Sequence, residues 1–346
     1  MKLYNEAGYV DITRILEHEA TFIFIYGGRG TGKTYGTLQE MIDGGHKFIY
    51  LRRLAAQADI VKKDDMQPFR TLNRDRDWSI RPFPINKYVS AFCESDVNDE
   101  GKIYATSEPV GLLTALSTFS NLRGIVCQDV EMIILDEFIP ELNERPIKGE
   151  ADAVFNTYET VNRNRELNGE KPVKFIFLAN SNRIDNPLFV ELNLVRIADK
   201  IRKNGNESYY DKKRHMLLID LYKSKISEEK SDTALYHLTK GTDFYNMAIR
   251  NAFLNDERGR IESKPLIEYK PVVSIGEICI YKHKSRKEYY VSAHMEGSPK
   301  HYGTGTKERE RFKKDCLYLY RAYMRNEIIF EEYINEIIFD RYFKTK

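Results

Sequence analysis

The feature that most constrains this chain is a buried strand leading into a glycine-rich loop. Residues Phe22–Ile25 are apolar, and Gly27–Thr34 (GGRGTGKT) follow the pattern G-x-x-x-x-G-K-[ST]. Glycines let the backbone turn tightly and bring its N–H groups close to an anion. The N-terminal end of the following helix favours negative charge at the same place. We therefore expect a phosphate-binding P-loop (Walker A) at the end of a buried strand.

The residues of this loop have expected roles in nucleotide binding. Lys33 would contact the β- and γ-phosphates of ATP, and Thr34 would offer its hydroxyl to Mg²⁺. Tyr4 and Tyr9 precede the strand and are candidates for stacking on the base, although the sequence favours a surface position for either tyrosine. The expected cofactor-binding residues are Gly27, Gly28, Arg29, Gly30, Thr31, Gly32, Lys33, Thr34 and Tyr35.

An acidic pair ends a second apolar run. In Val130–Glu137 (VEMIILDE), Asp136 and Glu137 follow residues typical of a buried parallel strand. This is the Walker B arrangement, in which Asp136 holds Mg²⁺ or its water and Glu137 acts as a general base on the attacking water. Asn180 follows another apolar run, VKFIFLA. We expect Asn180 to sense the γ-phosphate or hold the water; a simple turn residue is the alternative.

Four apolar runs, the three above and KFIYL at 47–51, alternate with helical segments as far as residue 180. This alternation predicts a parallel α/β sheet whose chemistry lies at one edge. Arg52 and Arg53 end the KFIYL run, where they would lie near phosphate or DNA, or simply be solvated. Residues 111–117 are expected to form a short helix.

Length and composition suggest two domains of a soluble protein. The chain has 346 residues, 42% of them hydrophobic and 31% charged, and a net charge of +2, which excludes a uniformly basic nucleic-acid-binding coat. We expect an ATPase domain over 1–222 with a lid-like insertion over 54–84. A linker over 223–256 and a C-terminal domain over 257–346 would follow. Four scattered cysteines indicate ordinary thiols of a reducing cytoplasm, and neither a signal peptide nor a membrane-spanning run is evident.

The C-terminal region is predicted to carry a β-hairpin around Lys284–Lys287, followed by helices over 307–325 and 327–343. Between Lys282 and Lys314 ten Lys and Arg face four Asp and Glu, a local net charge of +6. Such a surface suits nucleic acid or an acidic partner, and a solvated patch is the alternative.

Taken together, the motifs resemble those of the DNA-packaging (encapsidation) ATPases of small tailed phages, the Salasmaviridae-type podoviruses, which are related to large terminase motors. The matching segments are FIYGGRGTGKTY at 24–35, FIYLRR at 48–53, IILDEF at 133–138, TVNRNRE at 160–166, FLANS at 177–181 and, more weakly, the hairpin segment at 290–294. The resemblance implies a P-loop NTPase of the additional-strand, catalytic-glutamate type. It also implies a small α+β C-terminal domain, a vestigial RNase H-like fold without nuclease activity.

The resemblance also implies roles for individual residues. Glu137 would be the catalytic glutamate, and Arg163 would be an arginine finger that reaches the ATP of a neighbouring subunit. Arg123 falls where the family carries another basic residue thought to act across the interface. Arg165 is the alternative finger if the register differs.

The resemblance implies that the partners are double-stranded DNA, the prohead portal and further copies of this chain in a homo-oligomeric ring of five subunits. A structural RNA is a further candidate partner, and no membrane is expected. The motor would act in the host cytoplasm, transiently attached to the prohead vertex. A soluble P-loop kinase, a different DNA translocase or helicase, and an assembly factor that uses ATP only as a structural switch are the alternatives.

Overall fold

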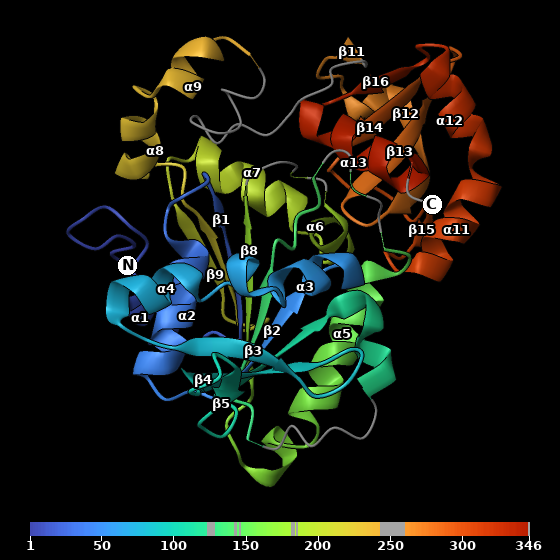
Figure 1. The fold of residues 1–346 in the computed structure, drawn as a ribbon. Helices are drawn as coiled ribbons and strands as arrows, with labels where there is room; N and C mark the ends of the chain where they lie inside the picture. The colour runs from blue at the N-terminus through green and yellow to red at the C-terminus, as the bar shows by residue number, and fades with distance from the viewer. Residues whose placement is uncertain are drawn as a thin grey trace. The chain divides into compact units, whose positions relative to one another are not determined.

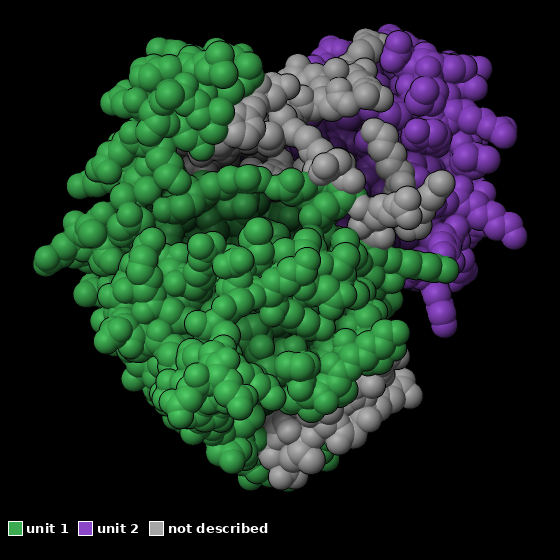
Figure 2. Space-filling view, viewed as in Figure 1, with its two compact units in different colours: residues 1–182, 205–253 green, residues 183–204, 254–346 purple. Residues whose placement is uncertain are grey.

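The computed structural model describes residues 1–122, 129–141, 144, 147–180, 184, 186–242 and 260–344. Contacts divide the chain into two compact units, coloured separately in Figure 2. Unit 1 comprises residues 1–182 and 205–253, and unit 2 comprises residues 183–204 and 254–346. No described helix is long and apolar enough to cross a membrane.

Unit 1 is built on a large mixed sheet, whose strands run through the lower part of Figure 1. Its ten described strands, in spatial order, are β3 (Ile80–Pro84), β4 (Ser90–Val97), β6 (Gly111–Ala115), β2 (Phe48–Arg52), β7 (Met132–Asp136), β8 (Lys174–Asn180), β1 (Phe22–Gly27), β10 (Met216–Asp220) and β9 (Ser208–Asp211), with β5 (Ile103–Ala105) paired to β4. The run from β6 to β10 is parallel throughout, and antiparallel strands flank it on both sides. The carboxyl ends of the parallel strands therefore share one edge.

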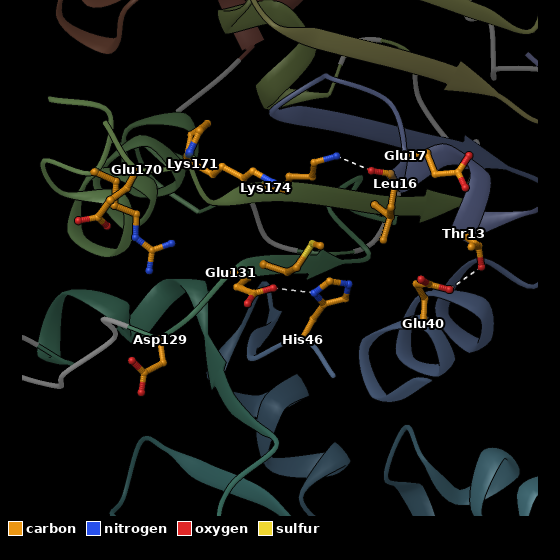
Figure 3. Close-up of a pocket in the computed structure, with 13 residues that line it drawn as sticks. Thr13, Leu16, Glu17, Glu40, His46, Asp129, Glu131, Glu170, Lys171 and Lys174 are labelled. Carbon is orange, nitrogen blue, oxygen red and sulfur yellow. Dashed lines mark hydrogen bonds and ion pairs between the residues drawn. The ribbon is translucent and has the colours of Figure 1, made fainter. Parts of the chain in front are cut away.

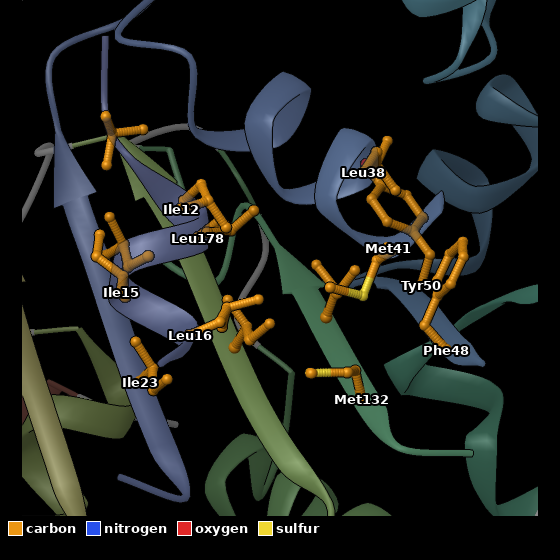
Figure 4. Packing of buried hydrophobic residues seen from close by; sticks show 14 of the residues in the cluster. Ile12, Ile15, Leu16, Ile23, Leu38, Met41, Phe48, Tyr50, Met132 and Leu178 are labelled. Atoms are coloured by element: carbon orange, nitrogen blue, oxygen red, sulfur yellow. The ribbon is translucent and has the colours of Figure 1, made fainter. Parts of the chain in front are cut away.

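The helices of unit 1 cover both faces of this sheet. They are α1 (Ile12–Leu16), α2 (Lys33–Asp43), α3 (Ala55–Val61), α4 (Arg70–Arg76), α5 (Glu150–Asn162), α8 (Lys225–Lys230) and α9 (Ala234–Leu238). Alternation along β1 explains how both faces are filled. Ile23 joins a buried cluster with residues of α1 and α2, shown in Figure 4. Phe22 and Phe24 turn to the other face, where Phe22 packs on Tyr158 of α5.

Two segments of unit 1 differ from the sequence-based expectation or refine it. Residues 111–115 form strand β6, not a helix, because this short apolar run fills the position between β2 and β4. A run of this length cannot be assigned by periodicity alone. The segment 54–84, which we expect to be lid-like, contains α3, α4 and the edge strand β3. Phe69 and Leu72 from this segment belong to the buried core of the unit.

Unit 2 holds a second, smaller sheet. Its order is β11 (Arg260–Ile261), β16 (Ile328–Phe330), β14 (Tyr289–Ser292), β13 (Ile278–His283), β12 (Tyr269–Ile275) and β15 (Lys300–Tyr302). The described α-helices of the unit are α6 (Pro187–Glu191), α7 (Val195–Lys203), α11 (Thr306–Asp315), α12 (Leu317–Met324) and α13 (Tyr333–Lys344). The predicted β-hairpin is present as β13 and β14.

The two long C-terminal helices that we expected are both interrupted. Residues 307–325 divide at Cys316 into α11 and α12, and residues 327–343 begin with β16 before α13 starts. Strand β16 pairs in parallel with β14, and its three residues are buried. The apolar residues Ile328–Phe330 thus add a strand to the sheet, which a helical pattern cannot distinguish over three residues.

Candidate functional site

The glycine-rich loop connects the carboxyl end of β1 to the first turn of α2. Gly30 and Gly32 have φ angles of +75° and +88°, which favour glycine. Space is limited there as well, since a Cβ on Gly32 would lie 3.2 Å from the ring of Tyr9. A Cβ on Gly30 would lie 2.0 Å from Nζ of Lys230. The positive φ angles therefore favour glycine at both positions, and any side chain would also have to displace Lys230 or Tyr9.

Lys33 is buried inside the loop. Its Nζ donates hydrogen bonds to the carbonyl oxygens of Gly28 at 2.7 Å and Gly27 at 3.3 Å, and to Oγ1 of Thr31 at 3.2 Å. Burial lowers the pKa of Lys33 to about 7, although the nearby Asp136 carboxylate works in the opposite direction. The loop is thus wrapped around an ammonium group that only carbonyl and hydroxyl oxygens solvate, which suits a site for an anion.

The other side chains of the predicted loop differ in their surroundings. Arg29 is exposed and forms an ion pair with Glu141. Thr31 is buried, and its hydroxyl donates to the carbonyl of Gly28 at 3.1 Å. The Tyr35 hydroxyl donates to Asp75 at 3.5 Å.

Asp136 is the centre of a hydrogen-bond network at the end of β7. Its carboxylate accepts from the Tyr50 hydroxyl at 2.6 Å and from the Thr34 hydroxyl at 3.1 Å. Arg52 also donates to it, at 3.4 Å. Parallel pairing places Arg52 opposite Asp136, and the two-residue period of the strand puts Tyr50 on the same face as Arg52. The sheet register therefore brings Tyr50 and Arg52 to Asp136, and the first turn of α2 places the Thr34 hydroxyl against the same carboxylate.

Glu137 follows Asp136 and forms an ion pair with Arg52. Its φ of +58° is unusual for a residue with a side chain, and such strain concentrates at functional sites. Burial raises the pKa of Glu137, while the guanidinium of Arg52 opposes this shift. A carboxyl with a raised pKa is better matched to general-base catalysis near neutral pH than an ordinary one.

Asn180 lies beside the loop at the end of β8. Strand β8 lies between β1 and β7, and Asn180 pairs in register with Gly27. Asn180 therefore lies between the strand that enters the glycine-rich loop and the strand that ends in the acidic pair. The sequence patterns predicted each of these strands, and Asn180 was expected at the end of a strand beside the one that carries the acidic pair.

Arg163 does not join this group within its own chain. Helix α5 begins at Glu150, which pairs with Arg53 at the carboxyl edge of the sheet. It ends at Asn162, whose Oδ1 accepts from the backbone N–H of Val173 just before β8 begins. Arg163 follows at the amino edge, exposed, with φ +48° and ψ −128°. Arg123 lies outside the described residues.

A buried ion pair went unrecognised in the sequence. Arg53 is fully buried, and its guanidinium binds Glu150, with Nη2 2.9 Å from Oε2, and also Glu144. This pair fixes the start of α5 beside the end of β2. Neither Arg52 nor Arg53 is the solvated residue that one reading of the sequence allowed, because each is paired with carboxylates. Two consecutive arginines at the end of a buried strand were the feature of the sequence that could have indicated this ion pair.

Two pockets flank the sheet. A pocket of about 540 Å³ adjoins the loop at Gly30 and Gly32 and is lined by Asn5, Tyr9 and Gln39, among others. Of the two tyrosines considered for base stacking, Tyr9 lines this pocket, whereas the Tyr4 hydroxyl donates to Glu207. A larger pocket of about 820 Å³ lies at the amino edge and is lined by Met132 and Lys174, the first residues of β7 and β8. It is also lined by His46, which comes two residues before β2 and is labelled with Lys174 in Figure 3.

The basic hairpin of unit 2 is organised by a buried histidine. Nδ1 of His283 accepts backbone hydrogen bonds from Ser285 at 3.1 Å and Arg286 at 2.9 Å. The turn between β13 and β14 therefore has a defined shape. The exposed cations that it presents are Lys282, Lys284, Arg286 and Lys287.

The fold and this site define an α/β protein with a glycine-rich loop and an acidic pair at the carboxyl edge of a parallel sheet. Residues 80–340 match the model of the podovirus DNA encapsidation protein (Gp16) family. The chain belongs to this family, and it is a phage DNA packaging protein. The glycine-rich loop precedes the matched range.

Individual proteins agree with this assignment. The chain is 30% identical to the DNA packaging protein of Bacillus phage B103, over 72% of this chain and 70% of that protein. It is 27% identical to the DNA packaging protein of Bacillus phage phi29, over 72% of this chain and 68% of that protein. The solved Phi-28 gp11 DNA packaging motor has a similar fold, with a TM-score of 0.60, 19% identity and 98% of each chain covered.

Proposed function

We propose that this chain is the ATP-hydrolysing subunit of a motor that drives double-stranded DNA through a portal into a preformed prohead. The observation that carries the proposal is the convergence of Lys33, Thr34 and Asp136 at one edge of the sheet, with Glu137 next in sequence. Family membership indicates the DNA packaging role, and the convergent residues would hydrolyse the ATP that drives it.

The strand order supports a P-loop NTPase of the additional-strand, catalytic-glutamate type, because β8 lies between β1 and β7. ATP would lie on the glycine-rich loop, with its phosphates at Lys33 and its base in the pocket beside Tyr9. Thr34 and Asp136 would hold Mg²⁺, since hydroxyl and carboxylate oxygens suit this ion and the two side chains already meet at 3.1 Å. The ion, when bound, neutralises charge on the phosphate oxygens.

Hydrolysis would use Glu137 as the base. Its carboxylate would take a proton from the water that attacks the γ-phosphorus, while the bond to the ADP oxygen breaks. Arg52 holds Glu137 by an ion pair, so the base would become available only when Arg52 releases it. Asn180, at the end of the intervening strand, would register the γ-phosphate.

Arg163 would act on the ATP of a neighbouring subunit. Its position at the amino edge, away from the loop of its own chain, supports action in trans, and its strained backbone supports a functional constraint. Arg123 would be a second basic group across the interface, with Arg165 as the alternative finger. Such sharing of sites would require a homo-oligomeric ring, for which we propose five subunits.

Unit 2 would attach the motor to the prohead, to a structural RNA or to DNA. We propose that this unit derives from an RNase H-type nuclease without retaining its activity. The residues that the structure describes contain no cluster of three metal-ligating side chains. The basic hairpin around His283 would contact DNA, the portal or a structural RNA through phosphate or acidic groups. The protein would work in the host cytoplasm at the prohead vertex.

Protection of DNA from DNase tests this proposal. Proheads, genomic DNA and ATP are mixed with wild-type protein or with the Lys33→Ala variant. We expect ATP-dependent protection with wild type and its loss in the variant. ATPase activity that free duplex DNA stimulates, without protection, would instead indicate another translocase. Turnover by a monomer on a small acceptor would indicate a kinase.

A further inference from the structure

A second lysine, from a distant part of the chain, reaches the glycine-rich loop. Lys230 ends α8, which follows β10, the strand beside β1. Its Nζ donates to the carbonyl oxygen of Arg29 at 2.7 Å, and it occupies the space where a Cβ on Gly30 would lie. Helix α8 is also close to the N-terminal segment, since a Cβ on Gly8 would lie 3.6 Å from Lys225.

Two lysine side chains bring positive charge to the glycine-rich loop. Lys33 and Lys230 both approach the loop, and no carboxylate forms an ion pair with either one within the part of the chain that the structure describes. Burial lowers the pKa of Lys230, and its ammonium and that of Lys33 donate to carbonyl oxygens of adjacent loop residues. Two ammonium groups that burial disfavours and that share one loop form a site for a multiply charged anion.

We propose that Lys230 binds the terminal phosphate of ATP and makes the position of α8 depend on which nucleotide is bound. This inference rests on the proposed function. The carbonyl oxygens that the two lysines bind indicate the terminal end of the ATP phosphate chain. Lys33 donates to the carbonyl oxygen of Gly28, and Lys230 donates to that of the adjacent Arg29. The lysine of such a loop contacts the β- and γ-phosphates.

The consequence is a link from the nucleotide to the second unit along the chain. When ATP binds, Lys230 exchanges the Arg29 carbonyl for a phosphate oxygen, which is a stronger, charge-assisted partner. When the phosphate leaves, Lys230 returns to the carbonyl. Helix α8, and with it the residues that continue in sequence toward unit 2, therefore takes a different position with ATP bound than after the phosphate has left.

Nucleotide binding by calorimetry, with Mg²⁺ present, tests the role of Lys230. We expect Lys230→Met to weaken ATP binding about 10- to 100-fold, the range for a hydrogen bond to a charged group, and ADP binding by less than about 3-fold. Lys230→Arg should restore most of the ATP affinity. Lys225→Met, at the exposed start of the same helix, is the matched control and should bind both nucleotides as wild type does.

A measurement on the unmodified protein keeps the test independent of folding of the variants. We expect ATP with Mg²⁺ to protect Lys230 from an amine-acetylating reagent more than ADP does, as read by mass spectrometry. Equal losses of ATP and ADP affinity in Lys230→Met, or no loss, or equal labelling with both nucleotides, would overturn the inference while leaving the proposed function intact. Wild-type protein that binds neither nucleotide would overturn both.

Discussion

The two edges of the large sheet carry similar kinds of residues in opposite surroundings. At the carboxyl edge, Tyr50 and Asp136 are buried, and Arg52 links the two acids. At the amino edge, His46 and Glu131 pair 2.6 Å apart, but the side chains are 28% and 57% exposed (Figure 3). The amino-edge pocket is the larger of the two described above, at about 820 Å³ against 540 Å³. Convergence and burial, not pocket volume, are therefore our grounds for proposing the carboxyl edge as the chemical edge.

The largest effect should come from the amino edge, through Arg163. Arg163→Ala should lower the kcat for ATP about 10³- to 10⁵-fold, the range for loss of an arginine finger. Arg163→Gly should be equally inactive yet more stable by about 1 kcal/mol, because glycine relieves a φ of +48°. Steady-state ATPase assays and urea unfolding measure the two quantities. A Gly variant that loses both activity and stability would indicate a structural role.

At the carboxyl edge, Glu137→Gln should lower kcat about 10²- to 10⁴-fold, the usual contribution of a general base. ATP binding should change little, because the amide keeps the shape of the side chain and still lies beside Arg52. Single-turnover hydrolysis and calorimetric binding separate the two effects. Unchanged turnover would exclude Glu137 as the base.

Stability should distinguish the edges as well. Arg53→Ala leaves Glu150 buried without its partner and should cost about 3–5 kcal/mol of unfolding free energy. His46→Ala removes an exposed pair and should cost less than about 1 kcal/mol. Urea unfolding of both variants makes the comparison. Similar losses would mean that burial does not separate the two edges as we describe.

The smallest effect concerns pH. Lys33 has a folded-state pKa of about 7, below the unfolded value of about 10.4, so the unfolded chain binds more protons between these values. Lys33 therefore lowers the stability of the nucleotide-free protein most below pH 7, and this penalty fades as the pH rises toward 10. Lys33→Met should thus stabilise the protein more at pH 6 than at pH 9.

Unfolding measurements at both pH values test this expectation. Lys171→Met removes an exposed lysine at the amino edge and controls for the lost positive charge. A gain from Lys33→Met that is the same at both pH values would show that the ammonium of Lys33 is not penalised by burial in the folded protein.

Local sequence pattern predicted the strands of the chemical edge but not their neighbours. The loop of β1 and the end of β7 are marked by glycines and acids within a few residues, which is why they could be recognised. The partners Tyr50 and Arg53 depend on register and on helix α5, nearly a hundred residues away in sequence. Lys230 reaches the loop from still further along the chain.

Short apolar runs were the other source of error. Residues 111–115 and 328–330 became strands because the sheets offered each a position between or beside existing strands. Over three to five residues, helical and extended patterns overlap, so tertiary pairing decides. The strands that carry the candidate site were therefore easier to predict than these two short strands.

The central claim is that ATP held at the carboxyl edge of one subunit is hydrolysed with Arg163 from another. Mixing Arg163→Ala protein with Lys33→Ala protein tests it most directly. Each should be inactive alone, the first for lack of an arginine finger and the second for lack of a functional loop. If the finger acts in trans, ATPase activity should appear on mixing and rise with the share of neighbouring pairs that combine an intact loop with an intact arginine. Activity that stays at the level of the separate variants would contradict the account.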